Sequence, residues 1–237
     1  MVATQPIQAR EYGADGPEVV VLHGGPGAPG SVAGLARALA ADVRGLEPLQ
    51  RVSVTVTLTV ARHVEDLAAL VRTPTLLVGW SWGAMLGLSF ATRYPDLVRG
   101  LVLVGCGTYD QDSRDLYRDA MQERLGELGR ARFIELQHRI ATGDDAEERD
   151  RWLAEMGGLA ERAQAVDPLP DEEGILEVDG AGHEETWTDV LRLQAEGVEP
   201  AAFSAIRSPV LMLHGAEDPH PGPATRDLLR RHVPQLE

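Results

Sequence analysis

A serine stands in the segment GWSWG at residues 79–83, which fits the pattern Gly-x-Ser-x-Gly. The apolar run before it predicts a strand over residues 75–79, and the spacing after it predicts a helix over residues 82–93. A serine on so sharp a turn needs an unusual backbone angle, and small flanking glycines leave room for it. The free N–H groups at the start of the helix favour developing negative charge. This setting predicts that Ser81 is a nucleophile rather than a chance serine in a glycine-rich chain.

A glycine-rich loop, HGGPG at residues 23–27, follows the first long apolar run of the chain. Stabilising an oxyanion takes two N–H donors that converge on one point, and a loop with several glycines lets backbone amides approach closely. The amides of Gly25 and Trp82 are the predicted donors, with Gly24 as the second choice. Trp80 and Trp82 beside the serine predict an apolar wall of the site. An ordinary Gly/Pro turn is the alternative for this loop, and its pairing with the serine turn disfavours that alternative.

Together, HGGPG and GWSWG resemble the α/β-hydrolase superfamily and are similar to its prolyl iminopeptidase branch. Residues 91–95 also look like the family's passage from helix to strand after the serine turn. The pair QR at residues 50–51 lies where that branch usually carries Asp-Gln-Arg-Gly, although leucine and valine replace its first and last residues. The resemblance covers residues 8–108 and 207–233. It implies hydrolysis through an acyl-enzyme on Ser81, with no metal or organic cofactor.

The resemblance also implies an acid just after a late strand, where Asp218 ends the sequence LMLHGAED and Glu217 is the next choice. A buried carboxylate there would hold the tautomer of a histidine and stabilise its cation. The family's order of serine, acid and histidine then places the histidine a few tens of residues after Asp218, at the end of one more strand. We therefore expect the sequence to be cut short at Glu237, with residues 234–237 entering that strand. The chain as it stands is then expected to lack its base.

Three histidines of the chain fit the position of this base less well. His220 comes only two residues after the predicted acid, and His232 lies in a helical turn near the end of the chain, so both are expected at the surface. His183 follows a glycine-rich segment like the family's own, but it precedes the predicted acid. As a base it would need another acid, such as Asp110 or Asp112. We expect it in the cap, facing substrate or solvent.

Apolar strands alternate with helices over the first part of the chain and again near its end. The predicted strands cover residues 19–22, 43–47, 75–79, 101–104 and 209–215. The predicted helices cover residues 31–40, 60–71, 82–93 and 223–233. Strict alternation over residues 52–58 would by itself indicate a further strand, although helical spacing starts directly after it. The fold class is therefore α/β, with a mostly parallel central sheet and helices on both faces.

Between residues 109 and 205 the pattern changes to long, charged, helical segments. These segments cover residues 115–140, 146–164 and 184–196. We expect an all-helical cap over residues 109–205, inserted between a first part of the core, residues 1–108, and a second, incomplete part, residues 206–237. Such a lid would select substrates for the site beneath it.

The composition narrows the function classes. The 237 residues carry 22 basic and 37 acidic side chains, and the net charge of −15 opposes binding to nucleic acid. No apolar run approaches the roughly 18 residues of a membrane span. Cys106 is the only cysteine, which excludes an internal disulfide and a cysteine-based metal site. Every basic residue is arginine, which indicates a GC-rich, bacterial genome, and the start MVATQPIQAR lacks a secretory pattern, so a cytoplasmic location is expected.

The sequence therefore favours a serine hydrolase that cleaves a small ester or amide, with a small molecule or a short peptide as its substrate. The iminopeptidase resemblance implies an N-terminal ammonium group on the substrate, for which Glu184, Glu185 and Asp189 of the cap are candidate partners. The alternative is a non-catalytic α/β-hydrolase-like protein that binds a small ligand, and the missing base would favour it. The intact serine turn and glycine loop favour catalysis, since binding alone needs neither.

Overall fold

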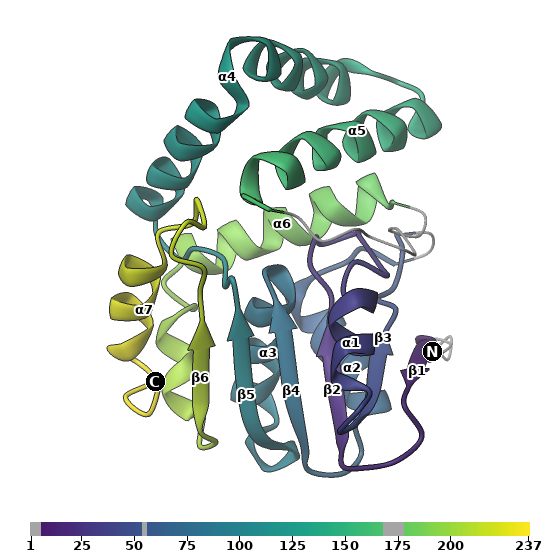
Figure 1. Ribbon diagram of the computed structural model, residues 1–237, viewed down its shortest axis with the longest axis vertical. Helices are drawn as coiled ribbons and strands as arrows, with labels where there is room; N and C mark the ends of the chain where they lie inside the picture. The colour runs from purple at the N-terminus through teal and green to yellow at the C-terminus, as the bar shows by residue number, and fades with distance from the viewer. Residues whose placement is uncertain (1–5, 54–55, 168–177) are drawn as a thin grey trace.

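The computed structural model describes residues 6–53, 56–167 and 178–237. Within these residues, six strands form one central sheet in the order β1-β3-β2-β4-β5-β6 (Figure 1). The strands are β1 (Ala9–Tyr12), β2 (Glu18–Leu22), β3 (Arg44–Pro48), β4 (Thr75–Trp80), β5 (Val98–Val104) and β6 (Val210–Leu213). β1 pairs antiparallel with β3, and every other neighbouring pair is parallel. The predicted α/β class with a mostly parallel sheet is confirmed.

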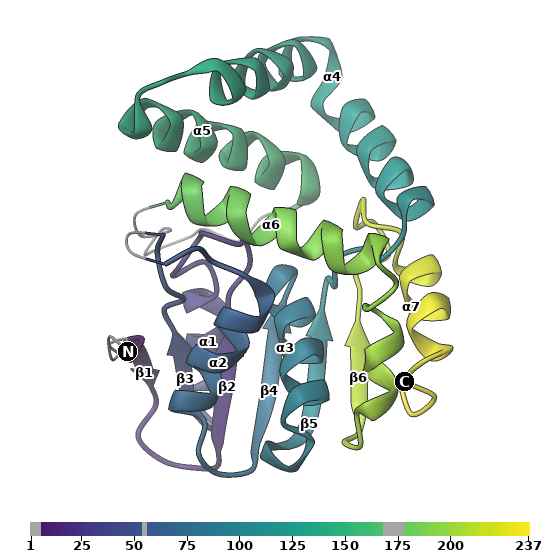
Figure 2. The same cartoon turned by 180° about the vertical axis from the view of Figure 1, so that it is seen from behind.

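Helices cover both faces of this sheet, as the two opposite views show (Figures 1 and 2). The helices of the core are α1 (Ala33–Leu39), α2 (Val60–Leu70), α3 (Trp82–Arg93) and α7 (Gly222–Arg230). Successive side chains of a strand point to opposite faces, and β2 follows this rule. Val19 and Val21 pack in a cluster with residues of α1, whereas Val20 and Leu22 pack in the cluster of α2 and α3. β2 is therefore buried on both sides, which explains its unbroken apolar sequence.

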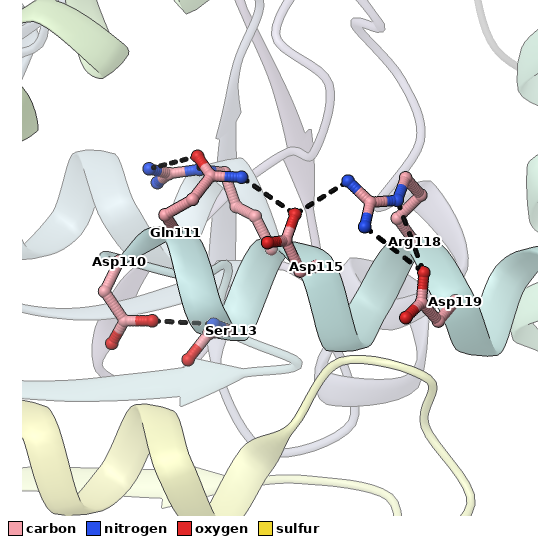
Figure 3. Close-up of polar contacts among 7 residues, drawn as sticks. Asp110, Gln111, Ser113, Asp115, Arg118 and Asp119 are labelled. Carbon is pink, nitrogen blue, oxygen red and sulfur yellow. Dashed lines mark hydrogen bonds and ion pairs between the residues drawn. The ribbon is translucent and has the colours of Figure 1, made fainter.

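Three further helices, called the cap from here on, lie over the carboxyl-terminal edge of the sheet (Figure 1). They are α4 (Gln111–Thr142), α5 (Ala146–Gln164) and α6 (Gly180–Ala195). The carboxylate of Asp110 begins α4 by accepting a hydrogen bond of 2.7 Å from the backbone N–H of Ser113 (Figure 3). Charged side chains of the next turns pair with one another on the helix surface. α4 then bends at Gly126, whose φ of 63° is not helical.

Two short segments differ from the sequence-based expectation. The sequence does not predict β1, because its four residues at the edge of the sheet contain no apolar run. The alternation over residues 52–58 does not form a strand: residues 52–53 and 56–58 lie outside every strand, and residues 54–55 lie outside the described residues. The backbone N–H groups of Ser53 and Leu58 bond to carboxylates at the start of α6, at 2.6 and 2.7 Å. These two backbone N–H groups are thus satisfied by the cap instead of by a neighbouring strand.

The chain returns to the core before β6. A short 3-10 helix, η2 (Ala201–Ala205), packs against α3, and its Phe203 is fully buried. The ring of Phe203 meets that of Tyr109 edge to face, with 5.3 Å between the centroids. Both ends of the predicted cap therefore contact each other beneath it. No helix in the described part of the chain combines the length and the apolar character needed to cross a membrane.

Candidate active site

Ser81 occupies the turn between β4 and α3. Its backbone angles, φ 53° and ψ −116°, make it the only residue other than glycine with a positive φ in the described ranges. Such a conformation stores about 1–3 kcal/mol of strain and persists only where the surroundings fix it. A Cβ at Gly79 would overlap the carbonyl oxygen of Gly83, and a Cβ at Gly83 would overlap that of Leu22. Only glycine fits at either position, which is the steric requirement that the sequence pattern predicts.

The serine lines a cavity of about 1000 Å³ between the sheet edge and the cap. Trp80 lines the same cavity. The hydroxyl of Ser81 makes no capping hydrogen bond to α3, so it is not engaged by its own helix. Two histidines also line this cavity, His183 from the cap and His220 from the loop after β6. Within the described residues, neither ring bonds to the hydroxyl, and such bonds are often long before substrate binds.

The two predicted oxyanion donors, Gly25 and Trp82, both line this cavity. Trp82 is the first residue of α3, where backbone N–H groups have no acceptor within the helix. Gly25 has a φ of 114°, which residues with a side chain rarely adopt. Gly24 packs against the turn that carries Ser81: a Cβ at Gly24 would lie 2.7 Å from the ring of Trp80 and 3.6 Å from Cβ of Ser81. The glycine loop therefore packs directly against the serine turn.

A buried hydrogen-bond network that the sequence does not predict links the glycine loop to α3. Nε1 of Trp82 donates to Oε1 of Gln50 at 2.8 Å. The backbone N–H of Gln50 donates to Nε2 of His23 at 3.2 Å, and its side-chain amide donates to the carbonyl of His23 at 3.4 Å. Burial lowers the pKa of His23 to about 4, so the ring is neutral and its Nε2 can accept. The neighbouring Arg51 forms a bidentate ion pair with Asp66, with both contacts at 2.7 Å.

Asp218 follows β6 and contacts a histidine. Its Oδ1 accepts a hydrogen bond from the backbone N–H of His220 at 2.8 Å and lies 2.9 Å from Nδ1 of the same residue. Burial acts to raise the pKa of Asp218, but the hydrogen bonds from His220 outweigh it and hold the pKa below its ordinary value. The ring of Tyr117 stacks on His220, with 4.0 Å between the centroids. The His220 side chain is only 14% exposed and lines the cavity of Ser81, so the expectation of a surface histidine is wrong.

His183 lies within α6, and most of the segment that precedes this helix lies outside the described residues. Its Nδ1 is 2.8 Å from the carbonyl oxygen of Pro26, so it connects the cap to the glycine loop. Of the two acids that could have served it, Asp110 caps α4 and Asp112 is exposed on the same helix. His232 follows α7 and does not line the cavity. Asp218 therefore lies between two histidines, because Nε2 of His214 is also 3.6 Å from its Oδ2, but only His220 of the two lines the cavity of Ser81.

Glu184 and Glu185, the predicted partners for an ammonium group, do not line the larger cavity. Glu184 is exposed and borders a neighbouring cavity of about 670 Å³. Oε2 of Glu185 accepts hydrogen bonds from the hydroxyl of Ser53 at 2.8 Å and from the backbone N–H of Leu58 at 2.7 Å. Asp189 likewise accepts a bond of 2.9 Å from the first backbone N–H of α2. The structure thus gives Glu185 and Asp189 a part in holding the cap to the core.

Other reactive side chains lie away from the serine. Cys106 is fully buried, and burial raises the pKa of its thiol to about 12. The nucleophilic thiolate is therefore not formed at neutral pH. Among the residues that the structure describes, no group of three or more His, Cys, Asp or Glu side chains is arranged to hold a metal ion.

Comparison with known proteins places this geometry in context. The model of the alpha/beta hydrolase family matches residues 19–236, and no curated protein matches the sequence. An esterase from Thermogutta terrifontis is 19% identical with a TM-score of 0.58, over 98% of this chain and 82% of its own. A marine microorganism esterase is 16% identical with a TM-score of 0.63, over 99% and 90%. An enol-lactonase from Burkholderia xenovorans LB400 is 16% identical with a TM-score of 0.59, over 98% and 86%. At these identities the structures share the fold alone.

Proposed function

Because the chain belongs to the alpha/beta hydrolase family, we propose that it hydrolyses a carboxylic ester or amide, an ester by preference, through an acyl-enzyme on Ser81. The observation that carries this proposal is the strained backbone of Ser81, φ 53°, at the start of α3 and at the wall of a cavity of about 1000 Å³. Strain of this kind is stored where it serves a mechanism. A protein that only bound a small ligand would need neither the strained serine nor the loop that meets it.

In the proposed reaction, Oγ of Ser81 attacks the carbonyl carbon of the substrate while a histidine takes the hydroxyl proton. The backbone N–H groups of Gly25 and Trp82 donate to the resulting oxyanion, and each such donor contributes about 3 kcal/mol to stabilising the transition state. The intermediate collapses as the carbon–oxygen bond to the leaving alcohol breaks, and the histidine returns the proton to that alcohol. Water then attacks the acyl-enzyme by the same route and releases the acid.

The acid of this proposal is Asp218, which holds a histidine and stabilises its cation. His220 is the described histidine that meets this requirement, since its Nδ1 is 2.9 Å from Asp218 and Nε2 remains for the serine proton. A histidine beyond Glu237 is the second candidate. Leu236 pairs in parallel with Val210, and the backbone of Glu237 bonds to β6 at 2.8 and 2.9 Å. A strand that continued this pairing would end at the same sheet edge as Asp218.

An ester is the preferred substrate because the carboxylates predicted for an amino-terminal ammonium group, those of Glu184 and Glu185, lie outside the cavity, and that of Glu185 already accepts two hydrogen bonds. Of the acidic residues that do line the cavity, Glu147 and Glu161 are exposed and Asp150 accepts a hydrogen bond from the backbone of Gly180. The prolyl iminopeptidase activity that the sequence resemblance implies is therefore the weaker candidate. The chain would act on a small molecule without a metal or organic cofactor.

Labelling with a fluorophosphonate probe tests the proposal, because the probe reacts only with an activated serine. We expect labelling of the wild-type chain, none of Ser81→Ala, and unchanged labelling of Ser31→Ala, a serine that lines the same cavity. Turnover of an ester should fall about 10⁶-fold in Ser81→Ala. If the wild-type chain and a chain extended to the stop codon of its reading frame both resist the probe, the result supports the non-catalytic binding protein instead.

The same assay identifies the base. If His220 is the base, His220→Ala should label at least tenfold more slowly, while His183→Ala stays near the wild-type rate. If the base follows Glu237, neither substitution matters, and a chain extended to the stop codon of its reading frame should label far faster.

A further inference from the structure

Two adjacent glycines stand in the middle of α5, where the fold does not require them. Gly157 and Gly158 lie well inside the helix Ala146–Gln164, and neither has a positive φ. A Cβ added at Gly157 would meet no atom within 4 Å, and one at Gly158 would meet only the terminal nitrogen of Arg162, at an ordinary 3.6 Å. Glycine is among the least favourable residues for a helix interior. Neither backbone geometry nor packing against the protein accounts for this pair.

Both glycines line the cavity that holds Ser81, and Ala154 and Ala160 of the same helix line it too. Gly157 is exposed and Gly158 is partly buried at this wall, so larger side chains at the two positions would narrow the space between α5 and the serine. The four small residues therefore leave room between α5 and the serine, and we infer that a ligand uses this room.

The cavity wall around this space is largely apolar. From the core side come Trp80, Trp82 and Met85, and from the cap come Phe133, Met156 and Trp187. These large side chains favour an apolar group over a hydrated one, by about fourfold in affinity for each methylene that leaves water.

The charged residues of this wall are paired or exposed. Arg114 bonds to Gln194 and Gln111, and Asp150 accepts a hydrogen bond of 2.9 Å from the backbone of Gly180. Glu147, Arg151 and Glu161 are exposed along α5. A charged substrate group would find no buried, unpaired counter-charge among these side chains.

We propose that the substrate is an uncharged ester with an extended apolar acyl group, and that this group lies against Gly157 and Gly158, which set the length that the site accepts. This inference rests on the proposed acyl transfer to Ser81 and adds the substrate class. The cavity of about 1000 Å³ suits such a ligand, because it lies at the upper end of the range for small-molecule sites and a short acyl group would fill little of it.

Hydrolysis of 4-nitrophenyl acetate and 4-nitrophenyl octanoate by the wild-type chain and by Gly157→Leu tests the inference. The wild type should show a kcat/KM at least tenfold higher for the octanoate. Gly157→Leu should lower kcat/KM for the octanoate at least tenfold more than it lowers that for the acetate. Gly34→Leu is the matched control, because Gly34 is an exposed helical glycine with an open Cβ position that does not line the cavity. Its selectivity should equal that of the wild type.

A binding measurement separates failure of this inference from failure of the proposed catalysis. Trp80, Trp82 and Trp187 line the cavity, so their fluorescence reports on a ligand there. In Ser81→Ala, methyl octanoate should bind at least tenfold more tightly than methyl acetate, and adding Gly157→Leu should remove that difference. Equal binding of the two esters, or an equal effect of Gly157→Leu on both, would overturn the inference even if the chain hydrolyses esters. Selective binding without hydrolysis would keep the inference for the ligand and reject the proposed function.

Discussion

Nε1 of Trp82 donates a hydrogen bond of 2.8 Å to Oε1 of Gln50. Through its side-chain amide and its backbone, Gln50 also bonds to His23, at the start of the glycine loop. One buried glutamine therefore connects the two elements that supply the proposed oxyanion donors, Gly25 and Trp82. A site of this kind depends on donors that are aligned before the substrate arrives.

Gln50→Leu should therefore lower kcat about tenfold and leave KM within twofold, since misaligned donors weaken the transition state more than the ground state. It should also lower the free energy of unfolding by about 1–3 kcal/mol, because the buried indole N–H loses its acceptor. Ester kinetics and urea unfolding measure the two effects. Gln111→Leu, at an exposed position on α4, is the control and should change neither. A rise in KM with unchanged kcat would show that Gln50 binds substrate instead.

The glycine that follows the serine turn gives a second prediction. A Cβ at Gly83 would overlap the carbonyl oxygen of Leu22 in β2, which lies in the middle of the sheet and cannot move away. Gly83→Ala should therefore destabilise the fold by roughly 2–4 kcal/mol. Gly34→Ala meets open space and should be neutral or slightly stabilising. Denaturant unfolding of both variants compares them, and similar midpoints would contradict the tight approach of α3 to β2.

The sequence predicts the turn at Ser81 because the residues that determine this turn are close together in the chain. The residues that create the turn at Ser81 are its immediate neighbours, and the apolar run of β4 and the spacing of α3 adjoin them. The cap helix α5 has the predicted bounds, since its charges and apolar positions repeat with a clear helical period over 19 residues. Strongly periodic segments and steric patterns within a few residues can be interpreted without knowledge of the tertiary contacts.

Contacts between segments that are distant in the sequence leave no local pattern. Alternation over residues 52–58 indicates a strand, but Glu185, some 130 residues away, binds the backbone of that segment. The spacing of His220 from Asp218 indicates a surface residue, but Tyr117 of the cap stacks on the His220 ring and partly buries it. In both cases a residue of the cap decides the local structure of a core segment, and many residues separate the two in the sequence.

Removing the Glu185 carboxylate tests whether this residue holds the cap to the core. Glu185→Ala leaves the backbone N–H of the buried Leu58 without its acceptor, so the free energy of unfolding should fall by about 1–3 kcal/mol. Kinetics with an aminoacyl 4-nitroanilide and a 4-nitrophenyl ester should change by the same small factor. Glu184→Ala, on the exposed neighbouring residue, should alter stability by less than about 0.5 kcal/mol. A selective rise in KM for the aminoacyl substrate at unchanged stability would restore Glu185 as an ammonium partner.

Glu199 gives the chain a pH-dependent stability. Its side chain lies beside α3, where Oε1 accepts a hydrogen bond of 2.7 Å from the hydroxyl of Ser89. Burial raises the pKa of Glu199 to about 7, with a smaller contribution from the charge of Asp189, and the bond from Ser89 only partly opposes it. Between the ordinary pKa of a glutamate and pH 7 the folded chain holds a proton that the unfolded chain has lost. The free energy of unfolding from this residue therefore falls as pH rises through that window.

Glu199→Gln should remove this effect, because an amide keeps an oxygen for Ser89 and carries no charge at any pH. The variant and the wild type should be equally stable at pH 5, and at pH 8 the variant should be more stable by roughly 1–3 kcal/mol. Urea unfolding at both pH values measures the difference. Burial lowers the pKa values of His23 and His63 to about 4, so these two residues make the free energy of unfolding rise with pH. Both are present in the variant and in the wild type, so their contribution cancels in the comparison. Glu123→Gln, on the exposed surface of α4, should follow the wild type at both pH values. If the stability of Glu199→Gln equals that of the wild type at both pH values, burial does not raise the pKa of Glu199. The hydrogen bond from Ser89 then stabilises the charged carboxylate by at least as much as burial destabilises it.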